Sequence, residues 1–305
     1  MSHHVNTSTL PRPLALSSAT AVPAYYRLTS LMRLPAKKGP GIYNEATLYH
    51  PRESLRVCWT SNTVDSRLRR GDIVTVRDGR ARALRPEILP VLRIARVDQP
   101  LAAVNPFELL PTSWLNDRAI VQRAKILWEQ MERPLQQLVN AALWDGARFY
   151  RFVTGPVSAA DYPGAPAGNF RRSVALAEEA LRLSDGLPNV ARGVLIAAAL
   201  LQDAGKADTF RLAPDGSGIA LSERGRWIGY QQTVLEWLAV ARTQVIVPDT
   251  LYLHLVHVLL ALHRPPETPQ AIETAILNVA RGFIDSPQRL RDADRLISRA
   301  PHPVG

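Results

Sequence analysis

The chain has 305 residues, of which 46% are hydrophobic and 21% are charged, and its formal net charge is +10. This balance is typical of a folded globular protein and excludes an intrinsically disordered chain. The length predicts two domains rather than one. The excess of lysine and arginine indicates a polyanionic partner, nucleic acid before a membrane, because no basic amphipathic stretch lies beside an apolar anchor.

The cysteine content and the hydropathy exclude several further classes of protein. The single cysteine, Cys58, excludes an intramolecular disulfide and a cysteine-based zinc cluster. No apolar run reaches the length of a transmembrane helix, and residues 14–22 are too poor in bulky apolar side chains to form a signal peptide. We therefore expect a cytoplasmic protein.

The first third of the chain predicts a small β-barrel. Residues 1–24 mix Ser, Thr, Ala and Pro without periodicity, which predicts a flexible leader. Leu55, Val57 and Trp59 alternate with polar residues, so one face of that strand is apolar. Short strand patterns separated by Gly, Pro and charged turns predict an OB-like barrel over residues 25–104. The predicted strands cover residues 26–34, 42–49, 54–60, 72–77 and 89–97.

Aromatic and basic side chains are interleaved in this predicted barrel, a mixture suited to stacking bases and following phosphates. The alternative is that the tyrosines form the barrel core and the arginines a solvated surface, because aromatic residues favour strands whatever the function. The arginine run from Arg67 to Arg85 has the same two interpretations, a phosphate-binding surface or a strand edge that discourages aggregation. The predicted nucleic-acid-binding residues are Tyr26, Arg33, Lys37, Lys38, Tyr43, Tyr49, Arg56, Arg69 and Arg70.

From residue 105 to the end of the chain the pattern is helical. Residues 193–204 are apolar on every face, which predicts a helix buried on all sides in the middle of the domain. Gly205 would end that helix in the left-handed conformation and leave Asp203 near negative carbonyl groups, where it needs a cation. The predicted helices cover residues 116–132, 135–144, 169–183, 193–204, 223–242, 249–263, 268–283 (with Thr268 as N-cap and Pro269 at the first position) and 288–298.

Several motifs follow the barrel pattern in a fixed order: ELLPTS, GNFRRSVALA, LLQDAGK, GRWIGY and LVHVLLALH. This order resembles the YhaM-type bacterial 3′→5′ exoribonucleases, which join an OB fold to a metal-dependent HD domain. The helical part also resembles the HD domain of conjugative relaxases. The resemblance covers residues 25 to about 285 and implies an α+β protein of two domains, an OB-like barrel (25–104) and an all-α HD-like domain (105–305).

The positions that this resemblance assigns to metal ligands have mostly changed. Gln202 replaces the histidine of the His-Asp-x-Gly-Lys signature, while Asp203 keeps its aspartate. Arginine cannot lose its proton and so cannot coordinate a metal, and glutamine and asparagine are poor ligands. The vestigial positions are Arg172, Gln202, Asp203, Tyr230, His263, Asn278 and Arg281.

The chemistry of these replacements predicts an internal ion pair where the family holds a metal. We expect Asp203 to pair with Arg172, with Arg281 or with both, because two guanidinium groups would repel a divalent ion. The alternative is a local ion pair between Asp203 and Lys206.

The leading hypothesis is a catalytically inactive HD-type protein, without a cofactor, that binds single-stranded RNA or DNA through the barrel. A first alternative is an active metal-dependent 3′→5′ exoribonuclease or phosphodiesterase, with a divalent ion such as Mn²⁺ held by Asp203, His257 and His263. A second alternative is an interaction scaffold in a conjugation or mobile-element system, which would bind a protein partner or form a homo-oligomer.

Overall fold

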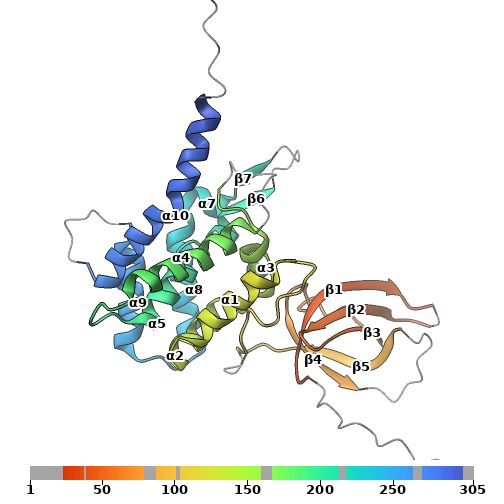
Figure 1. Cartoon of the computed structure of the whole chain (residues 1–305). Coiled ribbons are helices and arrows are strands. Elements are labelled where there is room, and N and C mark those ends of the chain that lie inside the picture. Colours follow the sequence, from red (N-terminus) through yellow and green to blue (C-terminus); the bar gives the residue numbers. More distant parts are fainter. Residues whose placement is uncertain are drawn as a thin grey trace, which may run out of the picture.

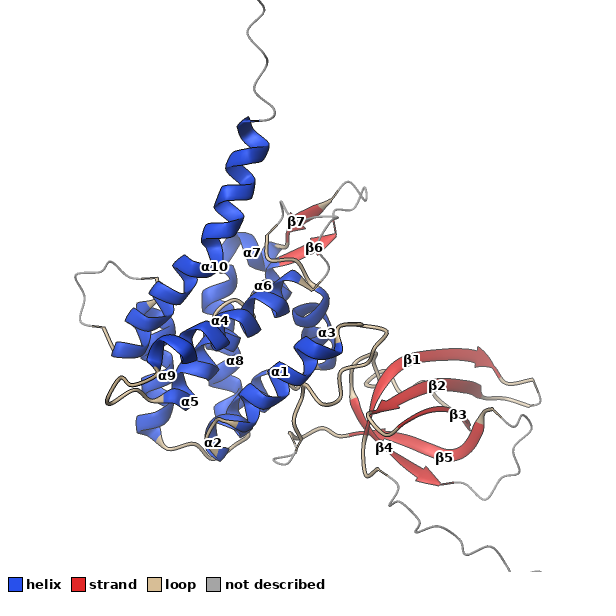
Figure 2. Ribbon diagram, in the orientation of Figure 1, coloured by secondary structure: helices blue, strands red, loops and turns tan. Residues whose placement is uncertain are grey.

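The protein is an α+β protein in which a five-stranded barrel is followed by a helical domain, as predicted (Figure 1; Figure 2). Side chains are described up to residue 285. The computed structural model describes residues 23–37, 39–78, 87–100, 104–158, 167–212, 218–263 and 270–297.

The strands close into a barrel in the order β1-β2-β3-β5-β4, with β4 returning to β1. Neighbouring strands are antiparallel except for β3 and β5, which are parallel. This mixed arrangement is OB-like. The strands agree closely with the prediction: β1 (Tyr26–Pro35), β2 (Ile42–His50), β3 (Glu53–Ser61), β4 (Ile73–Asp78) and β5 (Leu89–Arg96).

Alternation along the strands sorts the side chains between the barrel interior and its surface. Val57 and Trp59 of β3 are buried as predicted, while Arg56, which precedes Val57, is exposed. Tyr26 of β1 is only 1% exposed, and its hydroxyl donates to Glu53 at 2.5 Å. A ring enclosed in this way cannot stack on a base. The binding role predicted for Tyr26 is therefore wrong, and the core interpretation holds for this residue.

The helical domain is built around α5, and the burial predicted for this stretch is confirmed from Gly193 to Leu201. Small and branched side chains on every face allow helices to pack around it. The helices are α1 (Arg118–Glu129), α2 (Arg133–Ala142), α3 (Gly146–Thr154), α4 (Gly168–Ser184), α5 (Arg192–Leu201), α6 (Lys206–Thr209), α7 (Glu223–Trp227), α8 (Gly229–Arg242), α9 (Asp249–Ala261) and α10 (Ile272–Ile297).

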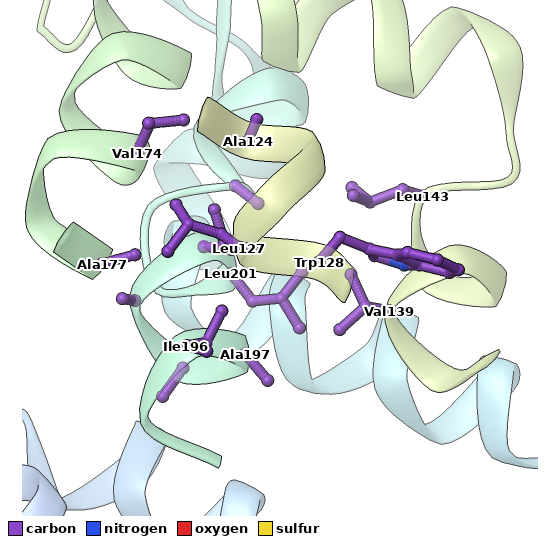
Figure 3. Packing of buried hydrophobic residues seen from close by; sticks show 14 of the residues in the cluster. Ala124, Leu127, Trp128, Val139, Leu143, Val174, Ala177, Ile196, Ala197 and Leu201 are labelled. Atoms are coloured by element: carbon purple, nitrogen blue, oxygen red, sulfur yellow. The ribbon is translucent and has the colours of Figure 1, made fainter. Parts of the chain in front are cut away.

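Side chains of α1, α2 and α4 gather around α5 in one hydrophobic cluster, shown in Figure 3. Leu127, Val139 and Ala177 come from these three helices, and Ile196 comes from α5. Burying one Leu or Ile side chain contributes about 1.5–3 kcal/mol. Apolar packing therefore holds the helices together around α5.

Gly205 does not adopt the left-handed conformation predicted for it, since its φ is −61°. The chain turns at the end of α5 and leads directly into α6. The residue is glycine for a steric reason, because a Cβ atom there would lie 2.0 Å from the carbonyl oxygen of Tyr230. This close approach places the start of α8 beside the turn that follows α5.

Two helical segments differ from the prediction, one because of a helix cap and the other because of a glycine with a positive φ. α3 was not predicted, although Asp145 caps it by accepting a hydrogen bond from the N–H of Arg148. The helix predicted over residues 223–242 is divided into α7 and α8, because Gly229 has φ +81°.

Two further differences concern the hairpin and the last helix. A short antiparallel pair, β6 (Phe210–Leu212) and β7 (Ile219–Leu221), was not predicted. α10 runs as one helix to Ile297, where two helices were predicted, and its distal part projects from the domain (Figure 1). The predicted cap of this helix, Thr268 with Pro269, lies outside the described residues.

A buried arginine attaches the barrel to the helical domain. Arg27 of β1 is 2% exposed, and its guanidinium donates to the carbonyls of Leu109 at 2.9 Å, Gly71 at 2.9 Å and Pro106 at 3.3 Å. The same group lies 4.5 Å from the ring centre of Phe149 in α3. These contacts satisfy the guanidinium within the junction, so Arg27 has a structural role.

Two glycines allow the backbones to meet at the same junction. A Cβ atom on Gly146 would lie 2.1 Å from the carbonyl carbon of Gly71, whose φ is +98°. Close by, the indole nitrogen of Trp144 donates to the carbonyl of Val97 at 3.0 Å. The barrel is therefore packed directly against the start of α3.

Candidate functional site

Arg172 of α4 is the centre of a charged cluster where α4, the end of α5 and α10 meet. One of its terminal nitrogens lies 2.7 Å from Asp203, and the other lies 2.8 and 2.9 Å from the two carboxylate oxygens of Asp285. The side chains of Arg172 and Asp203 are only 12% and 8% exposed. The predicted ion pair between Arg172 and Asp203 is thus confirmed.

The local partner proposed for Asp203 is present as well. The ammonium nitrogen of Lys206 lies 3.1 Å from Asp203 Oδ1, while Arg172 contacts Oδ2. Lys206 also lies 5.1 Å from the ring centre of Tyr230. Each carboxylate oxygen of Asp203 therefore has its own cationic partner. Arg172, Asp203, Lys206 and Asp285, with Gln202 and Arg281, are called the arginine cluster below.

Of the two arginines expected to pair with Asp203, only Arg172 forms that ion pair among the described residues. Arg281 of α10 donates to the side-chain oxygen of Gln202, which is 2% exposed. Asp203 is already neutralised by Arg172 and Lys206, so the neutral amide next to it becomes the acceptor for Arg281. Arg172 and Arg281 thus have different partners.

The other residues that the resemblance singled out lie around or outside this cluster. Tyr230 and His263 meet edge to face with ring centres 6.0 Å apart. Burial lowers the pKa of His263, and the nearby charge of Arg281 lowers this pKa further. Asn278 is exposed on α10.

The side chains at the cluster do not fit a metal ion. The two carboxylates that could coordinate one, Asp203 and Asp285, are held by the guanidinium of Arg172, which stays protonated. Among the described residues, no three His, Cys, Asp or Glu side chains gather in a group that could hold a metal ion. The alternative ligand set of Asp203, His257 and His263 is therefore not brought together.

Sequence reasoning missed Asp285, the second carboxylate bound by Arg172. It lies 113 positions from Arg172 along the chain. One signal was available, because Asp285 follows Arg281 by one helical turn and both side chains would share a face of α10.

A second polar region lies between the barrel and the helical domain. A cleft of about 750 Å³ on the barrel side is lined by Arg33, Arg69, Arg70 and Ser113, among others. A second cleft of about 510 Å³ is lined by Trp114, Arg118 and Arg171, with Asp117 as its acidic residue. Ser113 and Trp114 are consecutive in the chain and line one cleft each, and the guanidinium of Arg70 from the first cleft lies 5.9 Å from the ring centre of Trp114 in the second. We call the combined surface the junction groove, defined by Arg33, Arg69, Arg70, Ser113, Trp114, Asp117, Arg118 and Arg171.

Three groove arginines have neutral partners. Arg33 donates to the carbonyl oxygens of Asp65 at 2.7 Å and Leu68 at 3.0 Å. Arg118 donates to the hydroxyl of Tyr49 at 2.9 Å. Carbonyl and hydroxyl oxygens orient a guanidinium without cancelling its charge.

The third arginine with a neutral partner is Arg70, which stacks on an aromatic ring. A further groove arginine, Arg171, is held by an ion pair. The guanidinium carbon of Arg70 lies 4.5 Å from the ring centre of Tyr150. Arg171, by contrast, forms an ion pair with Asp117. The groove therefore presents more positive than negative charge.

The remaining predicted barrel residues are divided between the groove and the outer face of β2 and β3. The groove contains Arg33, Arg69 and Arg70. Tyr49 lies beside it, because its hydroxyl accepts a hydrogen bond from the groove residue Arg118. Tyr43 is half-buried on β2, Arg56 forms an ion pair with Glu45, and Lys37 is exposed. Lys38 lies outside the described residues. The sequence analysis missed the contributions of Trp114, Arg118 and Arg171, since these residues belong to the segment after the barrel and to the two helices beside it.

No helix in the described part of the chain is both long and apolar enough to span a bilayer. Comparisons with protein-family models, with curated proteins and with solved structures found no match to this chain.

Proposed function

We propose that this protein binds single-stranded nucleic acid in the junction groove and that its HD-like helical domain does not hydrolyse the strand. The observation that carries the binding proposal is the set of groove arginines that are oriented by neutral groups. Such arginines offer phosphate oxygens a charged donor that is already in place. The net charge of +10 supports the same partner class.

A partly exposed aromatic ring lies beside the groove. Tyr49 is half-buried and its ring centre lies 5.8 Å from the guanidinium of Arg118, whereas Trp114 lines the cleft with only 7% of its surface exposed. Stacking of a base on an aromatic ring is worth about 1–3 kcal/mol and tolerates any sequence. The proposed interface therefore combines phosphate contacts with stacking and does not discriminate strongly between sequences.

The proposal that hydrolysis is absent rests on Arg172. The motif order resembles the YhaM-type exoribonucleases, in which a metal ion activates water and neutralises phosphate charge. In this chain a permanently protonated guanidinium binds both Asp203 and Asp285. The arrangement supports the helical core without supplying a ligand set for the ion.

Fluorescence polarisation with a labelled single strand of about sixteen nucleotides, the upper range of an OB-fold site, tests the binding proposal. RNA and DNA strands and a duplex of equal length are compared between about 50 and 200 mM salt. We expect the affinity for single strands to fall steeply with salt, because each phosphate contact contributes about −0.7 to the slope of log K against log salt. The double variant Arg69→Ala/Arg118→Ala should reduce the magnitude of that slope by about 1 to 1.5.

A control variant removes the same charge elsewhere. Arg182→Ala/Arg192→Ala deletes two exposed arginines that pair with Glu179 and Asp185 in the helical domain. This control should bind like the wild type. Absent binding, binding insensitive to salt, or an equal loss in both double variants would refute the junction groove as the interface and favour a protein-interaction scaffold.

A separate assay addresses hydrolysis. Single-stranded RNA labelled at its 5′ end is incubated with the full chain and Mn²⁺, and product lengths are resolved by electrophoresis. We expect the strand to remain intact. Metal-dependent shortening from the 3′ end that is abolished by Asp203→Ala would establish the exoribonuclease alternative instead.

A further inference from the structure

A small pocket lies in the helical domain between the end of α5, α8 and α9, next to the arginine cluster. Its volume is about 210 Å³, below the range of about 300–1,000 Å³ that is typical of drug-sized ligands. It is large enough for one ring or two fused rings, since it equals the volume of roughly seven water molecules in the liquid. The lining includes Gln202, Gln231, Gln232, Leu259, Leu260 and His263.

Gln202 lines this pocket, and its side chain carries a buried donor without a partner in the described part of the chain. Gln202 is 2% exposed, and its side-chain oxygen accepts a hydrogen bond from Arg281. This bond fixes the orientation of the amide, because a flipped amide would place two donors against each other. The side-chain nitrogen of Gln202 then has no hydrogen-bond partner among the described residues. Burying such a donor without an acceptor is unfavourable, and a bound acceptor would offset that cost.

The other polar groups of the pocket are neutral and of mixed character. Gln231 and Gln232 each offer a donor and an acceptor, and a neutral imidazole at His263 offers one of each. The aliphatic walls come from α8 and α9 and suit the faces of a flat ring. This combination matches an uncharged planar molecule whose edge carries both donors and acceptors.

We propose that this pocket binds a nucleobase, with the side-chain nitrogen of Gln202 donating to a ring nitrogen or carbonyl oxygen at its edge. Amide side chains recognise base edges through paired donors and acceptors. The base comes either from a free nucleoside or from the end of a single strand, and both present the same edge. The inference does not depend on strand binding in the junction groove, because it rests on a different set of residues.

Ligand-observed saturation-transfer NMR and calorimetry with the full chain test the proposal. The probes are adenosine, guanosine, cytidine and uridine at millimolar concentration, each also supplied as the terminal base of a short single strand. We expect at least one nucleoside to bind with an affinity that changes little with salt, because the contacts involve no phosphate. Binding only by strands that end in that base would identify the strand end as the source.

Two substitutions of residues that line the pocket, and one control substitution outside the pocket, test where the nucleoside binds. Leu260→Phe fills the pocket and should abolish nucleoside binding, and Gln231→Ala should weaken it about five- to tenfold. Gln231 is only half-buried, so this second variant keeps the test valid if Leu260→Phe does not fold. Gln244→Ala, an exposed glutamine at the end of α8, should have no effect.

The possible results separate this inference from the proposed function. If no base binds, free or at a strand end, or if Leu260→Phe binds like the wild type, the pocket proposal is overturned, whatever the junction groove does. If a nucleoside binds in the pocket while long strands do not bind in the groove, the proposed function fails and the pocket proposal stands.

Discussion

The guanidinium of Arg172 lies 2.7 Å from the carboxylate of Asp203, and both side chains are largely removed from water. A buried carboxylate needs a cation, and a buried guanidinium needs acceptors. Asp285 supplies two further acceptor atoms for the same arginine. The pair therefore links α4 to the end of α5 and, through Asp285, to α10.

Arg172→Ala should lower the free energy of unfolding by about 3 kcal/mol, because removing one side of a buried ion pair leaves the other charge uncompensated. Lys206 still contacts Asp203, which keeps the loss near the lower end of the expected range. Denaturant unfolding followed by circular dichroism measures the change. The matched control is Arg182→Ala on the same helix, whose partner Glu179 is near the surface, with an expected loss of about 0–1 kcal/mol. Equal losses in the two variants would contradict a buried, stabilising role for Arg172.

Arg281→Ala should cost less than Arg172→Ala, about 1–2 kcal/mol, because its acceptor is a neutral amide rather than a carboxylate. The same variant leaves the Gln202 oxygen unpaired and frees the amide to rotate. The measurement is again denaturant unfolding, with Asn278→Ala on the exposed face of α10 as control. A loss as large as that of Arg172→Ala would show that Arg281 interacts with a charged partner instead.

Gly146→Ala should destabilise the protein by about 1–3 kcal/mol, because the added methyl group would lie 2.1 Å from the backbone of Gly71. The barrel and α3 would have to separate to accept it. Gly282→Ala is the matched control, since a Cβ atom at Gly282 meets nothing within 4 Å. That substitution within α10 should stabilise the helix by about 0.5–1 kcal/mol. Effects of the same sign would argue against a tight backbone contact at the junction.

Stability should fall as the pH drops below about 6.5, in part because of His263. Burial, assisted by Arg281, holds the pKa of His263 below its ordinary value of 6.5 in the folded state. Between the two pKa values the unfolded chain binds more protons at this residue than the folded chain does. The stability contribution is therefore complete above pH 6.5 and is lost as the pH falls towards the folded-state pKa.

His263→Gln removes this titration and should lose less stability than the wild type between about pH 7 and pH 5. Urea unfolding at several pH values measures the difference. His50 also has a lowered pKa, from burial and from Arg52, and stays present in both proteins. Identical pH profiles would exclude His263 as a contributor.

Much of the fold could be predicted from local pattern. Alternation of Leu55, Val57 and Trp59 predicted β3, because successive side chains of a strand point to opposite faces. The apolar residues of α5 predicted a helix buried on every side. α3 was not predicted although Asp145 caps it. The break before α8 was not predicted either, because a glycine in the sequence does not by itself indicate whether its φ is positive, as it is at Gly229.

The candidate site could be predicted only in part. The sequence by itself determined which side chains stand beside Asp203 along the chain and on α4, since arginine cannot coordinate a metal ion and glutamine is a poor ligand. The tertiary structure alone decided the partners. It gave Arg172 a second carboxylate in Asp285, gave Arg281 the amide of Gln202, and enclosed Tyr26 within the barrel. The physical reason is that charge interaction and desolvation depend on distance and burial in space, and residues 113 positions apart carry no local signal of either.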